Sequence, residues 1–156
     1  MIWAVRSKKL KRDWTLRHLA FVVKDIGETI SYYESLGLVG AVGPEIIVDL
    51  PGNGKSKMLF AEIGPLVIEF YQPVEGETMH KAFLEKHGEG IQRIAFAVKD
   101  IDKEVEELVG RGVKLMFRGD MPNGSRIAYF DTGKVGDILM ALVQPKGGIE
   151  TLTGNY

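Results

Sequence analysis

The side chains that could carry out chemistry in this chain are few and of restricted kinds. Its 156 residues include three histidines, His18, His80 and His87, and no cysteine. The lack of cysteine excludes disulfides, thiolate nucleophiles and thiolate metal sites. A transition-metal site would have to use histidine and carboxylate ligands, helped by amide, phenol or water oxygens.

The composition is that of an ordinary soluble domain, with 45% hydrophobic and 26% charged residues. A formal net charge of −1 gives no reason to expect nucleic acid or an anionic membrane as a partner. No stretch approaches the roughly 20 apolar residues of a membrane span. The basic N-terminus is followed by no apolar run with a cleavage site, so we expect no secretory signal and predict a cytoplasmic protein.

Two segments of the chain repeat each other. Residues 16–26 read LRHLAFVVKDI and residues 91–101 read IQRIAFAVKDI, with six identities in eleven positions at an offset of 75. Later in each copy, LVIEFYQP at 66–73 and ILMALVQP at 138–145 both end in Gln-Pro. An internal duplication predicts two structural units of one type.

Each copy predicts a strand followed by a helix. An apolar run rich in β-forming residues indicates a buried strand. In the first copy Asp25 is the predicted helix cap, and Gly37 and Gly112 stand where the two helices should end. Each helix has one apolar face at i, i+4 and i+7: Ile26, Ile30 and Tyr33 in the first copy, and Ile101, Val105 and Leu108 in the second.

Three further strands are predicted after each helix. They lie at 45–50, 57–62 and 66–71 in the first copy and at 113–117, 125–131 and 138–143 in the second. The order is therefore βαβββ twice, in the α+β class. We expect each half to be a curved mixed sheet with a helix on its outer face, and the two sheets to enclose a cup-shaped pocket.

This order predicts how the chain is divided. The units are a basic N-terminal extension (1–15), a first βαβββ module (16–73), a linker with a short helix (74–90), a second βαβββ module (91–145) and a flexible tail (146–156).

The duplicated unit resembles the vicinal oxygen chelate superfamily. That group includes glyoxalase I, methylmalonyl-CoA epimerase, extradiol dioxygenases, fosfomycin resistance enzymes and bleomycin-binding proteins. The local match is nearest to the epimerase branch: HLAFVVKDIGETISYYESLGL resembles its opening strand and helix, GEGIQRIAFAVKDI its second opening, and GDILMALVQP its closing strand. The resemblance covers roughly residues 16–145 and implies a glyoxalase-like fold. It says less about the reaction, because one fold hosts many chemistries.

The resemblance also implies a metal site, from which this sequence departs. In metal-dependent members four inward side chains hold a divalent cation, and the matching positions here are His18, Glu69, Arg93 and Ala141. His18 and Glu69 fit as residual metal ligands. A guanidinium only donates and repels a cation, and alanine has no donor atom. We therefore expect no metal, or a weakly held divalent metal. His80 and His87 lie in the linker, where we predict surface positions.

Arg93 is a candidate to replace the metal electrostatically. It would pair with Glu69, with His18 beside them. One hypothesis stops there, with a charged pair that fills an old metal site and has no further role. The other adds a ligand: Arg93 binds a carboxylate or stabilises an enolate oxygen, and Glu69 or His18 exchanges a proton at the carbon next to a carbonyl. Glu69, His18 and Arg93 are the predicted catalytic residues.

Strand alternation predicts which side chains line the cup. Phe21 and Phe96 should face away from it. The inward positions hold small residues, which predict free volume and thus a ligand pocket: Ala20, Ala95, Ala97 and Ala141. The predicted substrate-binding residues are Arg93, Tyr71, Ala141 and Tyr129.

Three functions remain open. The first is an enzyme of the epimerase or glyoxalase type, an isomerase or lyase, acting on a small carbonyl or acyl compound by proton transfer. The second is a metal-independent protein that binds a small molecule, as bleomycin-binding relatives do. The third is a scaffold whose cup is closed by homodimerisation, since exposed sheet edges would permit pairing. The sequence leaves open whether the halves face each other within one chain or across a dimer.

Overall fold

The computed structural model describes residues 10–49, 53–121 and 123–147. Within these residues the chain forms nine strands and three helices. The first half contains β1 (Thr15–Val22), α1 (Ile26–Ser35), β2 (Val39–Val42), β3 (Ile46–Asp49), β4 (Lys55–Ile63) and β5 (Leu66–Glu75). The linking helix α2 (Met79–His87) precedes a second half made of β6 (Gly90–Ala97), α3 (Ile101–Gly110), β7 (Lys114–Asp120), β8 (Arg126–Asp131) and β9 (Leu139–Gln144).

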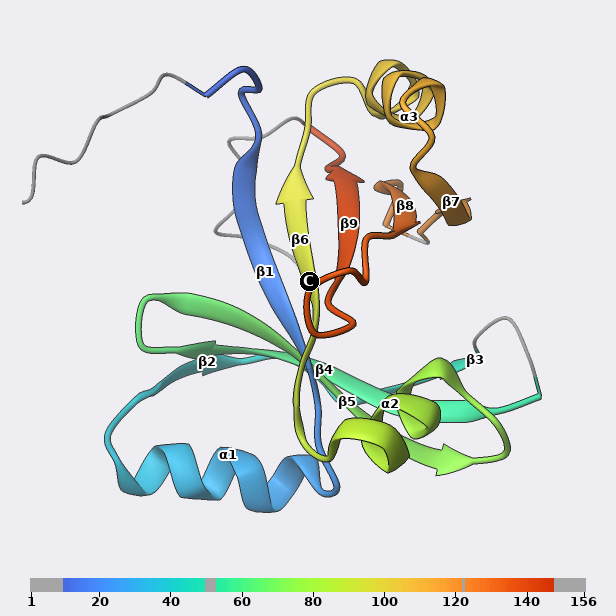
Figure 1. Cartoon of the computed structure of the whole chain (residues 1–156). Coiled ribbons are helices and arrows are strands. Elements are labelled where there is room, and N and C mark those ends of the chain that lie inside the picture. Colours follow the sequence, from blue (N-terminus) through green and yellow to red (C-terminus); the bar gives the residue numbers. More distant parts are fainter. Residues whose placement is uncertain (1–9, 50–52, 122, 148–156) are drawn as a thin grey trace, which may run out of the picture.

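The strands form one open, curved mixed sheet in the order β2-β4-β5-β1-β6-β9-β8-β7, with β3 also paired to β4. β1 runs parallel to β5, and β6 runs parallel to β9. The antiparallel pair β1–β6 joins the two halves, and Figure 1 shows these strands side by side in the middle of the molecule. The α+β class with a curved sheet is confirmed, and the halves join edge to edge within one chain.

The strand prediction misses one element. The first half has β2 between α1 and β3, so this half holds one strand more than the predicted βαβββ order. β2 is a four-residue edge strand with a glycine, and it pairs with the last part of β4. A segment of only four small, non-polar residues carries no clear period-two signal. The final residue of the predicted strand 45–50 lies outside the described residues.

The Gln-Pro repeats have a structural role that their sequence pattern alone did not indicate. The side-chain oxygen of Gln72 accepts a hydrogen bond of 3.0 Å from the backbone N–H of Ile26, at the start of α1. Gln144 accepts the equivalent bond of 2.9 Å from Ile101, at the start of α3. Together with the N-cap carboxylates, these amides satisfy N–H groups that a helix leaves unpaired. Those carboxylates belong to Asp25 and Asp100.

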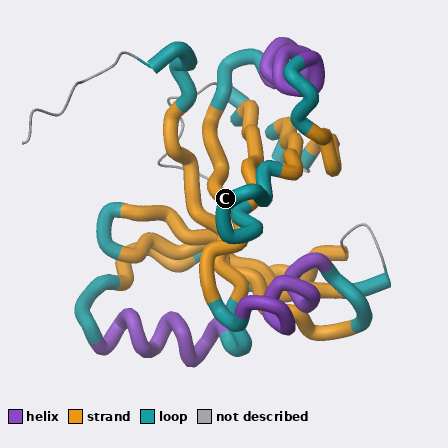
Figure 2. Tube along the Cα trace, in the orientation of Figure 1, coloured by secondary structure: helices purple, strands orange, loops and turns teal. Residues whose placement is uncertain are grey.

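The predicted helix faces and helix ends are confirmed. α1 and α3 cover the outer face of the two halves (Figures 1 and 2), and Gly37 and Gly112 follow them with φ of 70° and 82°. One buried cluster lies under α1, formed by Val23, Ile26, Leu59, Ala61, Ile68 and Phe70, with Ile30 and Tyr33 packed against it. The other lies under α3, formed by Val98, Ile101, Val105, Leu108, Ala128, Phe130 and Leu142.

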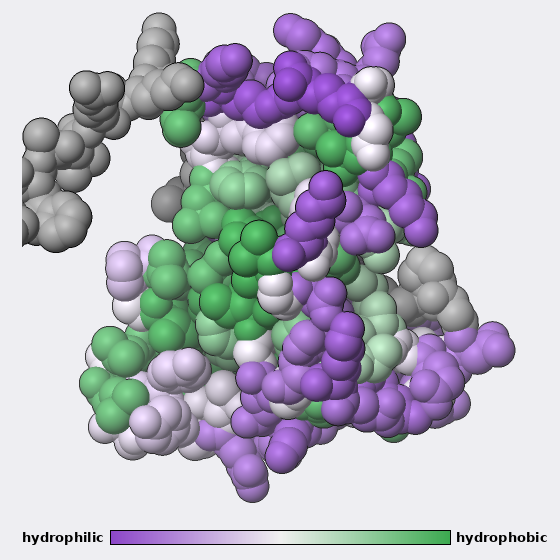
Figure 3. All heavy atoms as spheres, viewed as in Figure 1, coloured by the Kyte–Doolittle hydropathy of each residue, from purple (hydrophilic) through white to green (hydrophobic). Residues whose placement is uncertain are grey.

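The linking helix packs on the opposite, concave face. α2 contacts β5, β6 and β1, and its Phe83 and Leu84 pack against a buried cluster that includes Ala20, Val22 and Tyr71. Figure 3 shows hydrophilic residues gathered over α3 and α2, with apolar residues on the face between them. The linker therefore covers part of the cup.

The last residues of the predicted N-terminal extension contact the second half. Arg12 pairs with Glu104 and Glu107 of α3 and lies over the ring of Trp14, which packs against Phe96. The earlier part of the extension and the tail beyond residue 147 lie outside the described residues. No helix among the described residues is long and apolar enough to cross a membrane.

Candidate functional site

Three strands place an acidic and a basic residue on either side of a small one. Ala20 on β1 is the register partner of Glu69 on β5 and of Arg93 on β6. Because an alanine side chain ends at Cβ, the longer side chains can meet above it. Nη2 of Arg93 donates a hydrogen bond of 2.9 Å to Oε2 of Glu69.

His18 joins this pair from β1, two residues before Ala20 and on the same face. Its Nε2 lies 3.1 Å from Oε2 of Glu69, the oxygen that Arg93 also binds. The hydroxyl of Tyr71 donates to the other carboxylate oxygen, Oε1, at 2.9 Å. The structure thus brings together the three predicted catalytic residues and Tyr71, and both oxygens of Glu69 are engaged. We call these four residues, with Tyr129, the buried cluster.

The charges of the buried cluster are shielded from water. Arg93 is 1% exposed, and Glu69 and His18 are each 6% exposed. Burial by itself raises the pKa of the Glu69 carboxyl, but the charge and hydrogen bond of His18, followed by the charge of Arg93, lower it to about 2. Burial opposes the charge on Arg93, yet Tyr129, Tyr71 and Glu69 raise its pKa overall. At neutral pH the pair is therefore an ion pair.

Tyr129 and Ala141 complete the surroundings of Arg93. The guanidinium carbon lies 4.3 Å from the centroid of the Tyr129 ring, a cation–π contact. Tyr129 is the register partner of Ala141, so the small residue leaves room for this ring. The free volume predicted at the inward alanines is thus filled at two of them, by the ion pair above Ala20 and by Tyr129 beside Ala141. The four inward alanines are each at most 1% exposed: Ala20, Ala95, Ala97 and Ala141.

The prediction that His80 lies on the surface is wrong. His80 is 1% exposed, and its ring stacks on Tyr71 with centroids 3.9 Å apart. His87 is partly exposed and binds Asp137 at 2.9 Å. The missed signal is the spacing His80, Phe83, Leu84 and His87, which is i, i+3, i+4 and i+7, the spacing of an inward helix face. Their place in the linker suggested surface positions, whereas packing of α2 on the sheet buries His80.

Several nitrogens of this region have no hydrogen-bond partner among the described residues. They are Nε and Nη1 of Arg93, Nδ1 of His18 and Nε2 of His80, and each is buried. Buried polar groups are normally paired, because an unpaired one costs about 1–3 kcal/mol. These nitrogens therefore mark the positions where a polar ligand or water would be stabilised.

A divalent cation fits these side chains poorly. Among the residues that the structure describes, no group of three or more histidine, aspartate or glutamate side chains is placed to hold a metal ion. The Glu69 oxygen that would bind a cation already binds a guanidinium at 2.9 Å. Ala141 offers no ligand atom, and a fixed positive charge repels a second cation at close range.

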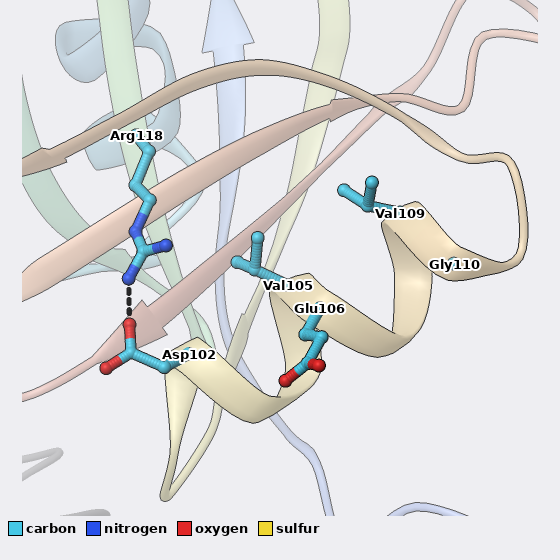
Figure 4. A pocket seen from close by; sticks show the side chains of 6 residues that line it. All are labelled: Asp102, Val105, Glu106, Val109, Gly110 and Arg118. Atoms are coloured by element: carbon cyan, nitrogen blue, oxygen red, sulfur yellow. Dashed lines mark hydrogen bonds and ion pairs between the residues drawn. The ribbon is translucent and has the colours of Figure 1, made fainter.

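Two hollows on the described surface are considered: one lies beside the buried cluster and the other lies away from it. One, of about 190 Å³, is lined by His18 together with Leu16, Arg17, Leu19, Pro65, Leu66 and Val67. The other lies between α3 and β7 (Figure 4), where the side chains of Arg118 and Asp102 point toward each other and pair. Asp102 also binds Arg126. Only the first hollow reaches a predicted site residue.

Comparison with known proteins gives a consistent picture. The uncharacterized protein YqjC of Bacillus subtilis (strain 168) is 26% identical over 134 residues, which are 85% of this chain and 93% of that protein. The crystal structure of a hypothetical protein from Bacillus halodurans C-125 is 28% identical with a TM-score of 0.68, covering 86% of this chain and 96% of that one. The crystal structure of methylmalonyl-CoA epimerase from Mycobacterium tuberculosis is 27% identical with a TM-score of 0.64, covering 84% and 87%.

The match to a family extends over most of the chain. Residues 17–130 match the Glyoxalase/Bleomycin resistance protein/Dioxygenase superfamily. This range runs from within β1 to within β8 and contains His18, Glu69 and Arg93. The chain therefore belongs to the glyoxalase/bleomycin resistance protein/dioxygenase superfamily.

Proposed function

We propose that this chain is an enzyme that transfers a proton at the carbon next to the carbonyl of a small carbonyl or acyl compound. One observation carries the proposal: a single oxygen of Glu69 binds both His18 and Arg93, while both of these side chains keep buried nitrogens unpaired. A positioned imidazole beside a positioned guanidinium is suited to remove a proton and to stabilise the oxyanion that results.

His18 is the proton-transfer group in this proposal. When Nε2–H of a neutral imidazole donates to Glu69, Nδ1 carries the free lone pair. Nδ1 takes the proton, the C–H bond breaks, its electron pair forms a C=C bond, and the carbonyl oxygen becomes an enolate facing Arg93. Glu69 is engaged at both carboxylate oxygens, by Tyr71 and by Arg93 with His18, and instead orients His18. Return of the proton to the same face of the enolate restores the substrate, and its return to the opposite face gives the epimer.

The similarity to methylmalonyl-CoA epimerase from Mycobacterium tuberculosis supports the reaction class. That protein is named for an acyl-CoA compound and an epimerisation, which places it among isomerases. We extend the isomerase or lyase class to this chain, with Arg93 in the electrostatic role that a metal has in the resembling enzymes. Tyr71, Tyr129 and Ala141 would contact the ligand. A homodimer in the cytoplasm is part of the same proposal.

Access to the buried cluster requires a path. α2 packs across the concave face, and Arg93 is 1% exposed. A ligand would reach the unpaired nitrogens by a shift of α2 or through the hollow that His18 lines.

Deuterium exchange tests the proposal across a range of candidate substrates. The protein is incubated in D₂O with a panel of 2-oxo acids and acyl-CoA thioesters, and loss of the C–H signal next to the carbonyl is followed by NMR. We expect catalysed exchange with at least one compound. His18→Gln should lower the rate at least ~100-fold, because its amide keeps the hydrogen bond to Glu69 but offers no base.

His87→Gln is the matched control, since His87 is a partly exposed histidine bound to Asp137. Exchange should be unchanged in this variant. Equal rates in His18→Gln and in the unmodified protein would remove His18 from the mechanism.

A second candidate function is binding without turnover. It is favoured by the state of Glu69, which is engaged at both oxygens and has a pKa of about 2. In that case the protein would bind a compound of the panel, and no exchange would be catalysed.

A further inference from the structure

The two ends of α2 are held to the rest of the protein in different ways. At the N-terminal end, the carbonyl of Met79 accepts a hydrogen bond of 3.1 Å from the buried side chain of Gln92. Next to it, Nδ1 of His80 lies 3.0 Å from the fully buried hydroxyl of Ser56. Contacts that are shielded from water resist local opening, so this end of the helix is firmly attached to the sheet.

The C-terminal end of α2 is held at the surface by one carboxylate of the second half. Oδ2 of Asp137, in the loop between β8 and β9, lies 2.7 Å from Nζ of Lys86 and 2.9 Å from Nε2 of His87. The ring of His87 also contacts the ring of Phe83, with centroids 4.8 Å apart. Phe83 packs in turn against the apolar residues under α2, which include Tyr71. The loop is therefore connected to the side chains that cover the concave face.

The loop presents Asp137 in a backbone conformation that an aspartate rarely adopts. Its φ of 56° is the one positive value at a non-glycine residue in the part of the chain that the structure describes. Glycine takes such a value without strain, and another residue that holds it often marks a functional position. The hydroxyl of Thr132 closes the loop by donating to the carbonyl of Ile138 at 3.2 Å. Leu139, the next residue, is the register partner of Arg93, so the loop leads directly to the buried cluster.

The strength of this contact suits a connection that opens and closes. Hydrogen bonds from Lys86 and His87 lower the pKa of Asp137, so its carboxylate is ionised at neutral pH. An exposed ion pair shifts an equilibrium by only roughly twofold to fivefold. Such a contact favours the closed position of the helix and still allows the helix to open.

We propose that the loop between β8 and β9 is a latch and that α2 is the lid that it holds. The helix opens from its C-terminal end when Asp137 releases Lys86 and His87. Opening at that end moves Phe83 and Leu84 away from the sheet and uncovers the concave face beside the buried cluster. The latch is independent of the proposed function, and only the passage of a substrate under α2 rests on it.

Amide hydrogen exchange of the free protein, followed residue by residue with NMR, tests the latch. Asp137→Gly removes the carboxylate and suits the positive φ, so the loop keeps its shape. The amides from Phe83 to Gly88 should then exchange about threefold faster, whereas the amides of β5 should keep their rates. Equal rates along α2 in Asp137→Gly and in the unmodified protein would overturn the proposal.

Two further variants separate the contact from a general effect on the loop. Lys86→Met acts from the helix and leaves the loop unchanged, and it should accelerate exchange of the same amides. Lys86→Met introduced into Asp137→Gly should add little, because the interaction is already lost. His87→Gln is the control, since its amide N–H replaces Nε2–H as a donor to Asp137 and its rates should stay within about twofold. Independent, additive effects of Lys86→Met and Asp137→Gly would overturn the latch.

A cross-link tests the lid. The chain has no cysteine, so Lys86→Cys combined with Asp137→Cys supplies a single pair of thiols that a short bifunctional maleimide can join. The linked protein should exchange the α2 amides more slowly than the unlinked variant, and its catalysed deuterium exchange of a substrate should be at least about tenfold slower. Undiminished substrate exchange in the linked protein would overturn the lid. If the unmodified protein catalyses exchange with no compound, the proposed function fails, and the amide rates, which need no ligand, still decide the latch.

Discussion

The two halves of this molecule agree on their helix-covered face and differ on their concave face. Under the helices, equivalent apolar residues fill equivalent places, such as Ile26 and Ile101, or Phe70 and Leu142. Both helices also begin with the same pair of caps, a carboxylate and the glutamine of Gln-Pro. Packing a helix against the sheet requires the same kinds of residue in both halves, and the repeat provides them in each.

On the concave face the two halves carry different residues at matching positions. The first half supplies His18 and Glu69, and the positions matched to them in the second half hold Arg93 and Ala141. A four-ligand metal site needs similar donors from each side, whereas an ion pair needs unlike charges. The difference between the halves is thus the feature that makes a buried ion pair of no net charge possible without a metal ion.

The largest effect should follow from removing the charge that the second half supplies. Arg93→Met leaves the Glu69 carboxylate buried without its guanidinium, which should lower the free energy of unfolding by about 3–5 kcal/mol in urea denaturation. Arg93→Met combined with Glu69→Gln should cost less than Arg93→Met alone, because no uncompensated charge remains.

An exposed ion pair provides the control for this comparison. Arg111 binds Glu107 on the surface of α3, with 67% of the Arg111 side chain exposed. Arg111→Ala should change stability by less than ~1 kcal/mol. A similarly small effect of Arg93→Met would show that the buried ion pair between the two halves contributes little to the free energy of unfolding.

Acid should destabilise the protein through groups of the first half and the linker. His80 has a pKa of about 3 in the folded protein instead of 6.5. Between these pH values the unfolded chain binds a proton at His80 and the folded chain does not, so stability falls as pH drops from about 6.5 toward 3. Glu69, with a pKa of about 2 instead of 4.5, adds a loss between about 4.5 and 2. The groups around them are His18, Arg93, Tyr71 and Tyr129.

Urea denaturation at pH 7, 5 and 3.5 measures this dependence, which we expect to be on the order of a few kcal/mol. His80→Phe should flatten the upper part of the curve and leave the Glu69 part below pH 4.5 in place. Unchanged pH dependence in His80→Phe would show that His80 does not resist protonation in the folded protein.

The smallest effect on stability should follow from removing the two helix-capping glutamines, and it should be equal in the two halves. Gln72→Ala and Gln144→Ala each remove one hydrogen bond to a first-turn N–H, and each should cost about 1 kcal/mol. Gln72→Glu and Gln144→Glu keep an acceptor at a helix N-terminus and should be nearly neutral. Unequal costs for the two alanine variants, measured by thermal or urea unfolding, would show that the helix-covered faces are less alike than their hydrogen bonds.

Much of the fold followed from local patterns in the sequence. The repeat, the i, i+4, i+7 spacing and the glycines predicted two similar halves with correct helices, because helix formation and packing depend on residues close in sequence. β2 was missed because a four-residue edge strand depends on its partner β4 more than on its own composition. His80 was misplaced although its helical spacing with Phe83 and Leu84 was available.

The sequence by itself determined which chemical groups this protein has to work with: a histidine and a glutamate in the first half, a permanent cation in place of a second histidine, and no cysteine. Only the tertiary structure decided that one oxygen of Glu69 joins His18 and Arg93 above Ala20, and that α2 brings His80 against Tyr71. The reason is physical. Residue type sets charge and donor number, whereas contacts between strands and a helix far apart in the chain depend on sheet register and on burial.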